Sequence, residues 1–427
     1  MKSKKLINVS AIMMALLLSV SAVGCSSSQD SSGAAATQTS STAVTSSAAA
    51  ASTDTAASST ATDSTTAAAG STNGTSTETA ALDTTDMFSD RDLEQTADLT
   101  AATQVTLESN KDVTLSKEGV YVLSGDVTNT TVVVDAPEDA KVQIVLDGAS
   151  ITNEDSPAIY VKAADKVFVT STDSENHMEV TGSYVADGDT NLDAVIYSKA
   201  DLTLNGKGTL EIVSKAGNGI SSKDDLKITG GVYTINSSSD AIEANDAILI
   251  NEGTVTIDSG KDALQSENDE DSSLGYIYIK GGTLNISAAD DAIRANSTVQ
   301  IDGGTINIKT CEEGIEATNI KINDGKITMY ANNDGINAAP KVNSTVAIEV
   351  NGGTIDVSMA SGDTDAFDSD GDLYVNGGTI NVEASSSFDA DGTAQLNGGD
   401  VTVNGEKITE ITQSRGGGGG GGRGKRG

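Results

Sequence analysis

The C-terminal half of the chain repeats a short alternation of apolar and polar residues. It reads TVTI at residues 254–257, TINI at 305–308 and TINV at 379–382. Alternation with a period of two is typical of a β-strand that buries one face. A second apolar piece, such as Ala292-Ile293, and a third, such as TVQI at 298–301, complete each repeat, with Gly, Asn and Asp between the pieces. Because these residues favour turns, the pattern predicts three short strands and three turns per repeat.

The repeats have a nearly constant length. The glycine that opens each repeat recurs at intervals of 23, 22, 29, 22, 21, 28, 25 and 21 residues, at Gly208, Gly231, Gly253, Gly282, Gly304, Gly325, Gly353, Gly378 and Gly399. Such a period marks a solenoid whose coils bury their apolar faces by stacking on their neighbours. We therefore predict an all-β fold, a right-handed, single-stranded parallel β-helix with about 22 residues and three strands per coil. The hand follows the general crossover preference.

Two repeats, of 29 and 28 residues, are longer than the rest. Their extra residues, 267–275 and roughly 339–345, are predicted to leave the helix as loops.

Two other solenoid types have repeats of related kinds. A leucine-rich repeat would need a Leu-x-x-Leu-x-Leu frame, which the chain lacks, and the calcium β-roll has a much shorter repeat. Neither alternative fits.

The first 24 residues have the pattern of a secretory signal. Lys2, Lys4 and Lys5 precede an apolar run at residues 11–20, and a small-residue segment ends at Gly24-Cys25. We predict that residues 1–24 are a lipoprotein signal peptide and that cleavage precedes Cys25. A lipid on Cys25 would then anchor an extracellular protein to the cell membrane. An ordinary secretory signal with an incidental cysteine is the alternative.

Composition divides the remainder of the chain. Residues 25–95 are mostly Ser, Thr and Ala, so they cannot bury enough apolar surface to offset the entropy of ordering and are predicted to be a disordered linker. Residues 96–412 are the predicted β-helix domain. Residues 413–427 are predicted to be a disordered tail rich in Gly and Arg. Such a tail can suggest RNA binding, but a solvated tail suits a surface lipoprotein better.

The predicted helix is strongly acidic. The chain has 62 acidic and 26 basic residues; four of the acids and three of the bases lie in the first 82 residues, and four bases lie in the tail. This leaves 58 acids against 19 bases on the helix. Nucleic acid is therefore excluded as a natural ligand, and any polyanionic ligand would need a cation as mediator.

The acids also fall into two columns when the Ala-Ile pieces are aligned. The first column contains Asp240, Asp262, Asp291, Glu313, Asp334 and Asp365. The second, three residues further along each repeat, contains Glu243, Gln265, Arg294, Glu316, Asn337, Asp368 and Asp389. Coils stack ~4.8 Å apart, a separation at which two unit charges repel by about 1 kcal/mol in water and about 3 kcal/mol at an effective dielectric of 20. The columns therefore favour a bound cation.

Calcium is the predicted cofactor, because it takes carboxylate oxygens at ~2.3 to 2.6 Å and one ion can bridge adjacent coils. The predicted ligands are Asp240, Glu243, Asp262, Asp291, Glu313, Glu316, Asp334, Asp363, Asp365, Asp368, Asp370 and Asp372. The last five belong to one of the densest acidic runs, and another lies at residues 267–271. Neither run has the glycine and glutamate of an EF-hand. The alternative is a solvated acidic face screened by salt.

Few residues suggest catalysis. His177 is the only histidine, so Ser-His-Asp catalysis and zinc sites have almost no basis. Arg294 could serve as the base of a β-elimination, but pairing with Asp291, Glu316 or another neighbouring carboxylate fits it better. Tryptophan is absent and aromatic residues are 3% of the chain, which argues against a flat aromatic platform for crystalline neutral glycans. We predict that the protein is not an enzyme.

Several phrases resemble the clostridial cell-surface carbohydrate-binding β-helix proteins, over about Leu99 to Thr412. They include VLDGASIT at residues 145–152, PAIYVK at 157–162, AVIYSK at 194–199 and NDEDSSLGYIYI at 268–279. The resemblance implies a right-handed β-helix similar to polysaccharide lyases, with bound calcium, that binds cellulose and acidic glycans such as polygalacturonate. The coils at residues 217–220 and 386–389 depart from the Asp-Gly-Ile or Asp-Ala-Ile pattern. This departure weakens the expectation of calcium at those two ends.

Together these observations predict a lipid-anchored, calcium-loaded β-helix that binds polysaccharide at the cell surface. Calcium would bridge its carboxylates to those of a polyuronate, whereas a neutral glucan would use outward ladders such as Thr283, Asn285, Thr305 and Asn307. A polysaccharide lyase, with calcium acidifying the sugar α-proton and Arg294 or a lysine removing it, is the enzyme alternative. A structural cell-wall spacer without a ligand is the third.

Overall fold

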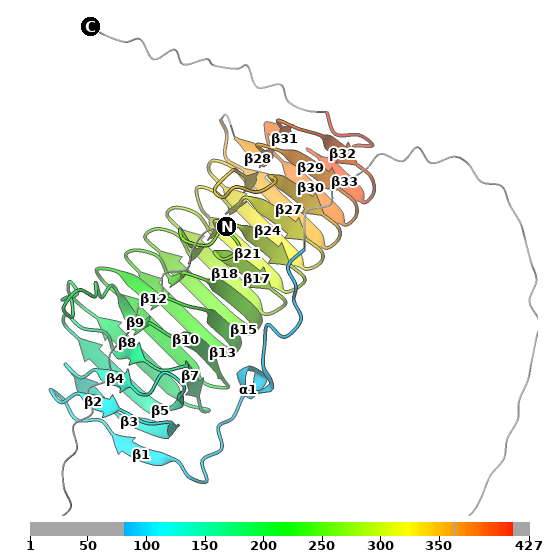
Figure 1. Ribbon diagram of the computed structural model, residues 1–427. Helices are drawn as coiled ribbons and strands as arrows, with labels where there is room; N and C mark the ends of the chain where they lie inside the picture. The colour runs from blue at the N-terminus through cyan, green and yellow to red at the C-terminus, as the bar shows by residue number, and fades with distance from the viewer. Residues whose placement is uncertain (1–80, 363, 413–427) are drawn as a thin grey trace, which may run out of the picture. The chain divides into compact units, whose positions relative to one another are not determined.

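The computed structural model describes residues 81–362 and 364–412. Their strands wind into a parallel β-helix, which confirms the predicted fold (Figure 1). All pairings between described strands are parallel except that of the last two, β33 and β34. The predicted signal peptide, Cys25, the linker up to residue 80 and the tail lie outside the described residues. Within the described part of the chain, no helix is both long and apolar enough to cross a membrane.

Each coil has three faces, two formed by a 22-stranded sheet and the third by a 12-stranded sheet. The first face contains β1 (Thr103–Thr106), β7 (Lys166–Ser171), β10 (Asp201–Gly206), β17 (Tyr276–Ile279), β20 (Thr298–Ile301), β23 (Asn319–Ile322), β26 (Ala347–Val350), β29 (Asp372–Val375) and β32 (Ala394–Leu396). The second face contains β8 (Glu175–Val180), β11 (Thr209–Ser214), β18 (Thr283–Ala288), β21 (Thr305–Thr310), β24 (Lys326–Ala331), β27 (Thr354–Met359), β30 (Thr379–Glu383), β33 (Asp400–Val403) and β34 (Glu406–Lys407). Four long strands run through both faces, namely β3 (Gly119–Thr128), β5 (Lys141–Asn153), β13 (Leu226–Ser237) and β15 (Ala247–Ser259). The third face contains β2 (Val113–Leu115), β4 (Val132–Asp135), β6 (Ile159–Ala163), β9 (Ala194–Ser198), β12 (Asn218–Ser222), β14 (Ile242–Ala244), β16 (Leu264–Ser266), β19 (Ile293–Ala295), β22 (Ile315–Ala317), β25 (Ile336–Ala338), β28 (Asp365–Ser369) and β31 (Ser386–Ala390).

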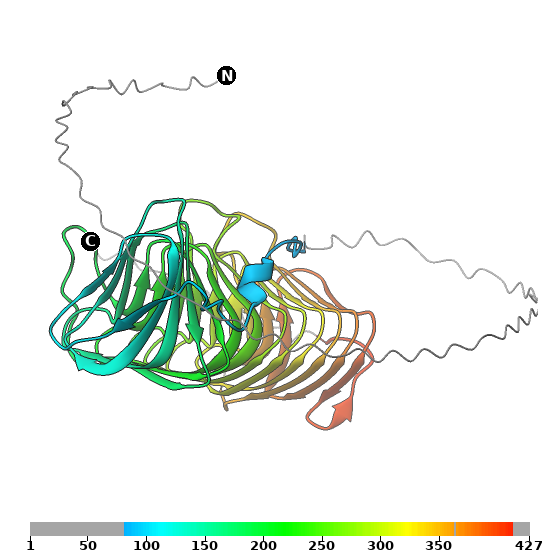
Figure 2. The same ribbon diagram turned by 90° about the horizontal axis from the view of Figure 1, so that it is seen from below.

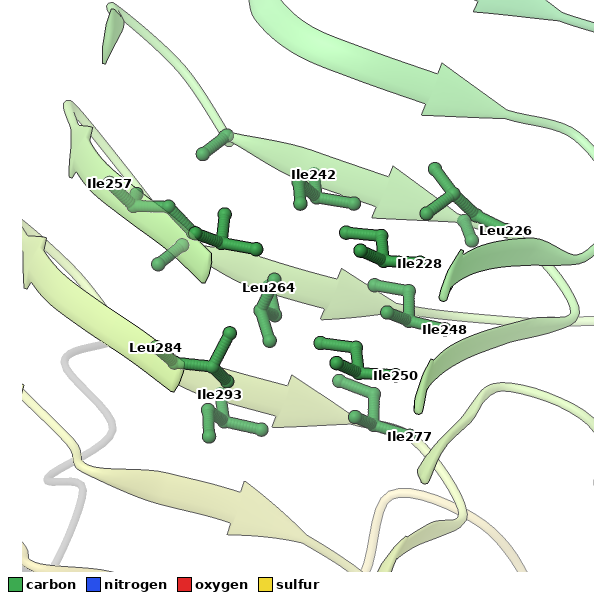
Figure 3. Packing of buried hydrophobic residues seen from close by; sticks show 14 of the residues in the cluster. Leu226, Ile228, Ile242, Ile248, Ile250, Ile257, Leu264, Ile277, Leu284 and Ile293 are labelled. Carbon is green, nitrogen blue, oxygen red and sulfur yellow. The ribbon is translucent and has the colours of Figure 1, made fainter. Parts of the chain in front are cut away.

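The core is a set of apolar columns that run along the inside of the coils. On the third face Ile242, Leu264 and Ile293 are in register on successive strands, and on the first face Ile228 and Ile250 are in register (Figure 3). All five side chains are fully buried. Each such burial contributes about 1.5 to 3 kcal/mol relative to an exposed side chain. The period-two alternation of the sequence therefore sets which residues face inward.

The turn between the first and second faces explains the paired glycines. Gly282 has a φ of +86°, which favours glycine, and a Cβ on Gly281 would lie 2.6 Å from the backbone oxygen of Asn251. Beside this turn, asparagine side chains donate from coil to coil: Asn351 to Asn323 at 2.8 Å, Asn376 to Asn351 at 2.9 Å and Asn397 to Asn376 at 2.8 Å. This asparagine ladder stabilises the turn in successive coils.

The extra residues of the two long repeats leave the helix as loops, as predicted, and the structure places both loops at the same turn. Residues 267–275 connect β16 to β17, and residues 339–346 connect β25 to β26. Both connections join the third face to the first. The two loops therefore lie along one edge of the third face, at different coils.

The N-terminal boundary of the helix differs from the prediction. Residues 82–95, assigned from composition to the disordered linker, are ordered and lie on the outside of the first face; we call them the strap. Its Leu82, Met87 and Phe88 pack against Leu249 and Tyr278. The helix α1 (Asp90–Leu93), within the strap, lies against β10 and β13 (Figures 1 and 2).

A buried ion pair holds the strap in place. The Asp92 carboxylate is 1% exposed and lies 2.7 Å from the Lys166 ammonium. It also accepts a hydrogen bond from the Thr203 hydroxyl at 2.7 Å, while its backbone oxygen accepts one from Thr229. The prediction from composition assigned the strap to the disordered linker because the strap has few apolar residues. A few specific contacts offset the entropy cost of ordering it instead.

Candidate functional site

The second predicted column of residues exists as an outward-facing row on the third face. Strand pairing places in register Glu243, Gln265, Arg294, Glu316, Asn337, Asp368 and Asp389. The same row continues toward the N-terminus through Ser221, Tyr197 and Tyr160. We call the whole row the outward column. Its neighbours in each strand point into the core, so the alignment made from sequence is confirmed.

Residues of the first predicted column lie where the third-face strands begin, and several of their carboxylates bind the main chain. Asp240 Oδ1 accepts the backbone N–H of Asp262 at 3.0 Å, and Asp262 Oδ1 accepts that of Asp291 at 2.9 Å. Asp334 Oδ1 accepts the backbone N–H of Asp365 at 3.0 Å. One oxygen of each of these carboxylates is therefore occupied by the next coil, which sequence spacing alone did not reveal.

Carboxylates converge most closely around Asp291. The ligand atoms of Asp262, Asp290 and Asp291 lie within 4.8 Å of one another, and so do those of Asp291, Glu313 and Glu316. Opposite ligands of one calcium ion are separated by about twice the ~2.3 to 2.6 Å bond length, so these spacings suit a shared cation. We call the five residues the Asp291 cluster. Asp290 was not among the predicted ligands, although the Asp290-Asp291 doublet was visible in the sequence.

Burial makes the Asp291 cluster costly to ionise. It raises the pKa of Asp262 to about 6, and the charge of Asp240 adds to the effect. Burial raises the pKa of Asp291 to about 8, reinforced by Asp262 and Glu313. Burial, followed by the charge of Glu316, raises the pKa of Glu313 to about 7. A bound cation would relieve both causes, because it replaces lost hydration and offsets the repulsion.

Two basic side chains already offset part of this charge. Arg294 lies 3.5 Å from Asp262, 3.8 Å from Asp291 and 3.2 Å from Glu316. The Lys341 ammonium, from the loop at residues 339–346, lies 2.6 Å from Glu316. With every group ionised, five carboxylates face two bases, so the cluster keeps an excess of negative charge. Burial lowers the pKa of Arg294, but Asp262 and Glu316 outweigh it and raise the pKa overall, which suits ion pairing.

Glu243 lies apart from this cluster. Its carboxylate accepts a hydrogen bond from the Asn218 amide at 2.6 Å and lies 3.1 Å from the Lys223 ammonium. Beside it is a polar hollow of about 570 Å³, lined in part by Glu243 and Gln265 and walled by Glu267, Asp269 and Glu270 of the loop at residues 267–275. The acidic run at residues 267–271 therefore lies next to the outward column.

The acidic run at residues 363–372 is arranged differently. Asp363 lies outside the described residues. Burial, then Asp334 and Asp365, raise the pKa of Asp368 to about 7. Among the described residues, no three carboxylates of this run have ligand atoms that all lie within 4.8 Å of one another, as those of the Asp291 cluster do. Asp372 accepts hydrogen bonds from the Tyr374 hydroxyl at 3.0 Å and the Thr393 backbone at 2.7 Å.

Phe367, in the same run, is fully buried and stacks on Phe388 with ring centroids 5.1 Å apart. It therefore belongs to the core and offers no surface to a ligand.

The predicted glycan-binding ladder lies on another face. Thr283 and Asn285 of β18 pair with Thr305 and Asn307 of β21, on the second face. The Asn307 amide donates to the Asn285 oxygen at 3.0 Å. These residues are half-buried and form a regular polar strip, but the structure does not bring them to the Asp291 cluster. Any glycan on this strip would contact a surface distinct from the outward column.

The helical part of the chain matches a known protein family. The profile of a family described as carbohydrate-binding domain-containing protein matches residues 109–366 and 316–409. A protein with the same description from Acetivibrio thermocellus is 34% identical over 132 residues, 30% of this chain and 46% of that protein. The chain thus spans about half the length of this relative. A solved structure described as a polysaccharide lyase-like protein from C. thermocellum, gadolinium derivative, is 24% identical with a TM-score of 0.38 and covers 69% of this chain and 87% of its own.

Proposed function

This chain belongs to the family of carbohydrate-binding domain-containing proteins, and we propose that it binds acidic polysaccharide through calcium held by the Asp291 cluster. The observation that carries the proposal is the convergence of Asp262, Asp290, Asp291, Glu313 and Glu316 within one stretch of the third face. Family membership supports carbohydrate as the ligand class; the cluster supports the cation.

Calcium suits the cluster on chemical grounds. All its donors are carboxylate oxygens, the hard ligands that calcium prefers, and no histidine or cysteine thiolate contributes. Adjacent coils supply the ligands, so bound ions would also connect coil to coil. Asp291 is common to both groups of three, and Lys341 already engages Glu316. The group of Asp262, Asp290 and Asp291 is therefore one candidate ligand set, and Asp291 with Glu313 is the other.

A polyuronate can coordinate a metal ion that is held on this face. The exposed Asp290 and the outward column leave one side of the cluster toward solvent, where a sugar carboxylate can complete the coordination. Successive coils repeat every ~4.8 Å along the axis, close to the spacing of sugars in a linear chain, so several sugars can follow the coils. Neutral glucans such as cellulose would instead use the strip of Thr283, Asn285, Thr305 and Asn307.

The surroundings of Arg294 favour binding over lyase chemistry. A general base must lose its proton, whereas three carboxylates surround Arg294 and its pKa is raised. A calcium-assisted β-elimination would then need a lysine as its base. The third candidate, a cell-wall spacer, gives no account of why carboxylates with raised pKa values are concentrated here.

We further propose that the protein acts outside the cell, held to the membrane by a lipid on Cys25. The carbohydrate ligand would come from a plant cell wall or from the cell's own envelope. The excess of acids over bases in the chain, 62 against 26, disfavours nucleic acid as a partner.

A glycan pull-down tests the proposed function. Purified protein is mixed with insoluble or immobilised polygalacturonate and cellulose, each with calcium and with a chelator. We expect retention on polygalacturonate that chelator removes, and retention on cellulose, if any, that is less sensitive to chelator. Equal passage of the protein through every matrix would support the spacer, and release of unsaturated sugar would support the lyase.

A further inference from the structure

The N-terminal half of the outward column differs from the acidic half. Here the column consists of Tyr160 on β6, Tyr197 on β9 and Ser221 on β12. Two residues after each of them come Lys162, which lies within β6, and Lys199 and Lys223, which directly follow β9 and β12, on three consecutive coils. Their register follows from the pairing of the preceding residues and from backbone bonds between coils. The three lysines, one coil apart, form a basic row on an otherwise acidic protein; we call it the lysine row.

A carboxylate of the same chain is already bound to this row. Asp187 belongs to the loop at residues 181–193, between β8 and β9. Its Oδ2 atom lies 2.6 Å from the Lys162 ammonium and accepts a hydrogen bond from the Tyr160 hydroxyl at 3.2 Å. The bond from Lys162 lowers the pKa of Asp187. A tyrosine hydroxyl and an ammonium together therefore bind one carboxylate group.

The contact with Asp187 is one that a ligand can replace. Its side chain is 49% exposed and that of Lys162 is 37% exposed. Such exposed ion pairs stabilise the fold little, because water and salt screen them. Lys199 is exposed and donates to the Thr190 hydroxyl at 2.7 Å, a partner without charge. A chain of linked carboxylates can engage neighbouring lysines at once, an advantage that a single aspartate lacks.

We propose that the lysine row is a calcium-independent subsite for the carboxylates of a uronic-acid glycan, with Asp187 holding the place of the first carboxylate. The inference rests on the proposed function, since it assumes that the ligand is an acidic polysaccharide. The glycan would lie along the helix axis, with neighbouring sugars matched to neighbouring coils. Glu243 already pairs with Lys223, so Lys162 and Lys199 carry most of the recognition. The same chain could continue along the outward column to calcium at the Asp291 cluster.

The test measures binding of a short oligogalacturonate in chelator and low salt, by calorimetry on the whole protein. Asp187→Asn removes the competing carboxylate and should tighten binding by about two- to fivefold, the range expected for an exposed ion pair. Lys162→Gln with Lys199→Gln should weaken it by at least as much, and added salt should weaken it further. The matched control is the exposed pair of Lys407 and Asp400, 2.7 Å apart, where Lys407→Gln and Asp400→Asn should change nothing.

Opposite effects of the aspartate and lysine substitutions distinguish a ligand site from a structural contact, which both would weaken. Weaker binding by Asp187→Asn, or no effect of the lysine changes, would overturn the proposal. Equal binding of a neutral oligosaccharide, or of polyglutamate, would also overturn it, because the first shows no role for charge and the second no role for sugar. Oligogalacturonate binding that requires calcium throughout would remove this subsite while leaving the proposed function intact.

Discussion

The Asp262 carboxylate accepts the backbone N–H of Asp291, one coil further along the helix, at 2.9 Å. The same column position in an earlier coil is Asn218, whose Oδ1 accepts the backbone N–H of Asp240 at 3.1 Å. An amide oxygen therefore fulfils this structural role as well as a carboxylate does. The main-chain bond does not require the negative charge that the aspartates add in later coils, and this charge is available for a cation.

This relationship predicts different effects for two substitutions of Asp262. Asp262→Asn keeps the acceptor and removes repulsion, so in chelator its free energy of unfolding should equal or exceed that of the wild type. Asp262→Ala leaves the buried N–H of Asp291 without its acceptor and should cost about 1 to 3 kcal/mol. Denaturant unfolding of both variants checks this, and equal losses would contradict the assigned role of the side-chain oxygen.

The raised pKa values predict how stability depends on pH without metal. Asp262, Asp291 and Glu313 have folded pKa values of about 6, 8 and 7, above their ordinary values near 4. The folded state therefore holds extra protons, and the stability they contribute is fully present below about pH 4 and is lost as pH rises through 6 to 8. The melting temperature in chelator should fall over that range.

Calcium should reverse this loss. It competes with protons for the same oxygens, so its stabilisation should grow from pH 5 to pH 8 and reach ~2.7 kcal/mol at a hundredfold excess over the dissociation constant. Thermal melts across pH, with and without calcium, measure both effects. A calcium shift that is the same at every pH would contradict binding by these groups.

The contacts of the strap predict a large loss of stability when Asp92, which lies far from the Asp291 cluster, is replaced. Burial alone would raise the pKa of Asp92, but bonds from Lys166 and Thr203 lower it to about 2. Asp92→Ala leaves the Lys166 ammonium buried without its close partner and should cost about 3 to 5 kcal/mol. The exposed Asp90 in the same helix is the control, and Asp90→Ala should stay within about 0.5 kcal/mol. Similar losses in denaturant unfolding would contradict the anchoring role of Asp92.

Substitution of Arg294 distinguishes a binding protein from a polysaccharide lyase. If it offsets the charge of the Asp291 cluster, Arg294→Gln should raise calcium affinity severalfold, because the guanidinium no longer repels the ion. Wild-type protein incubated with polygalacturonate and calcium should release no unsaturated sugar. Steady growth of ultraviolet absorbance that disappears in Arg294→Gln would instead establish elimination chemistry.

Much of this architecture could be predicted because the helix repeats its sequence along with its backbone. The position of Ile293 in one repeat predicts that of Ile315 in the next, and the strands pair in that register. Side-chain direction follows from the period-two alternation, so Arg294 and Glu316 were correctly aligned on the outward column. The local sequence pattern was sufficient to predict strand register and side-chain direction wherever each coil resembles its neighbours.

Prediction failed where one segment crosses many coils or breaks the repeat. The strap contacts residues more than a hundred positions away, such as Thr203 from Asp92, and no local period signals such a contact. The loop at residues 181–193 interrupts the repeat, so Tyr160 and Tyr197 were not aligned with Glu243. Asp290 lies outside the inferred columns, and only the fold of the turn brings its carboxylate to that of Asp291.

The central claim is that the Asp291 cluster holds the calcium through which the protein binds acidic polysaccharide. Its most direct test is the affinity for polygalacturonate as a function of free calcium, in the wild type and in the double variant Asp291→Asn, Glu313→Gln. Asp258→Asn, at an exposed acid on the second face, is the matched control. We predict that calcium raises the affinity of the wild type and the control together, and that the double variant folds but shows little calcium response. A double variant that responds to calcium as the wild type does would contradict the account.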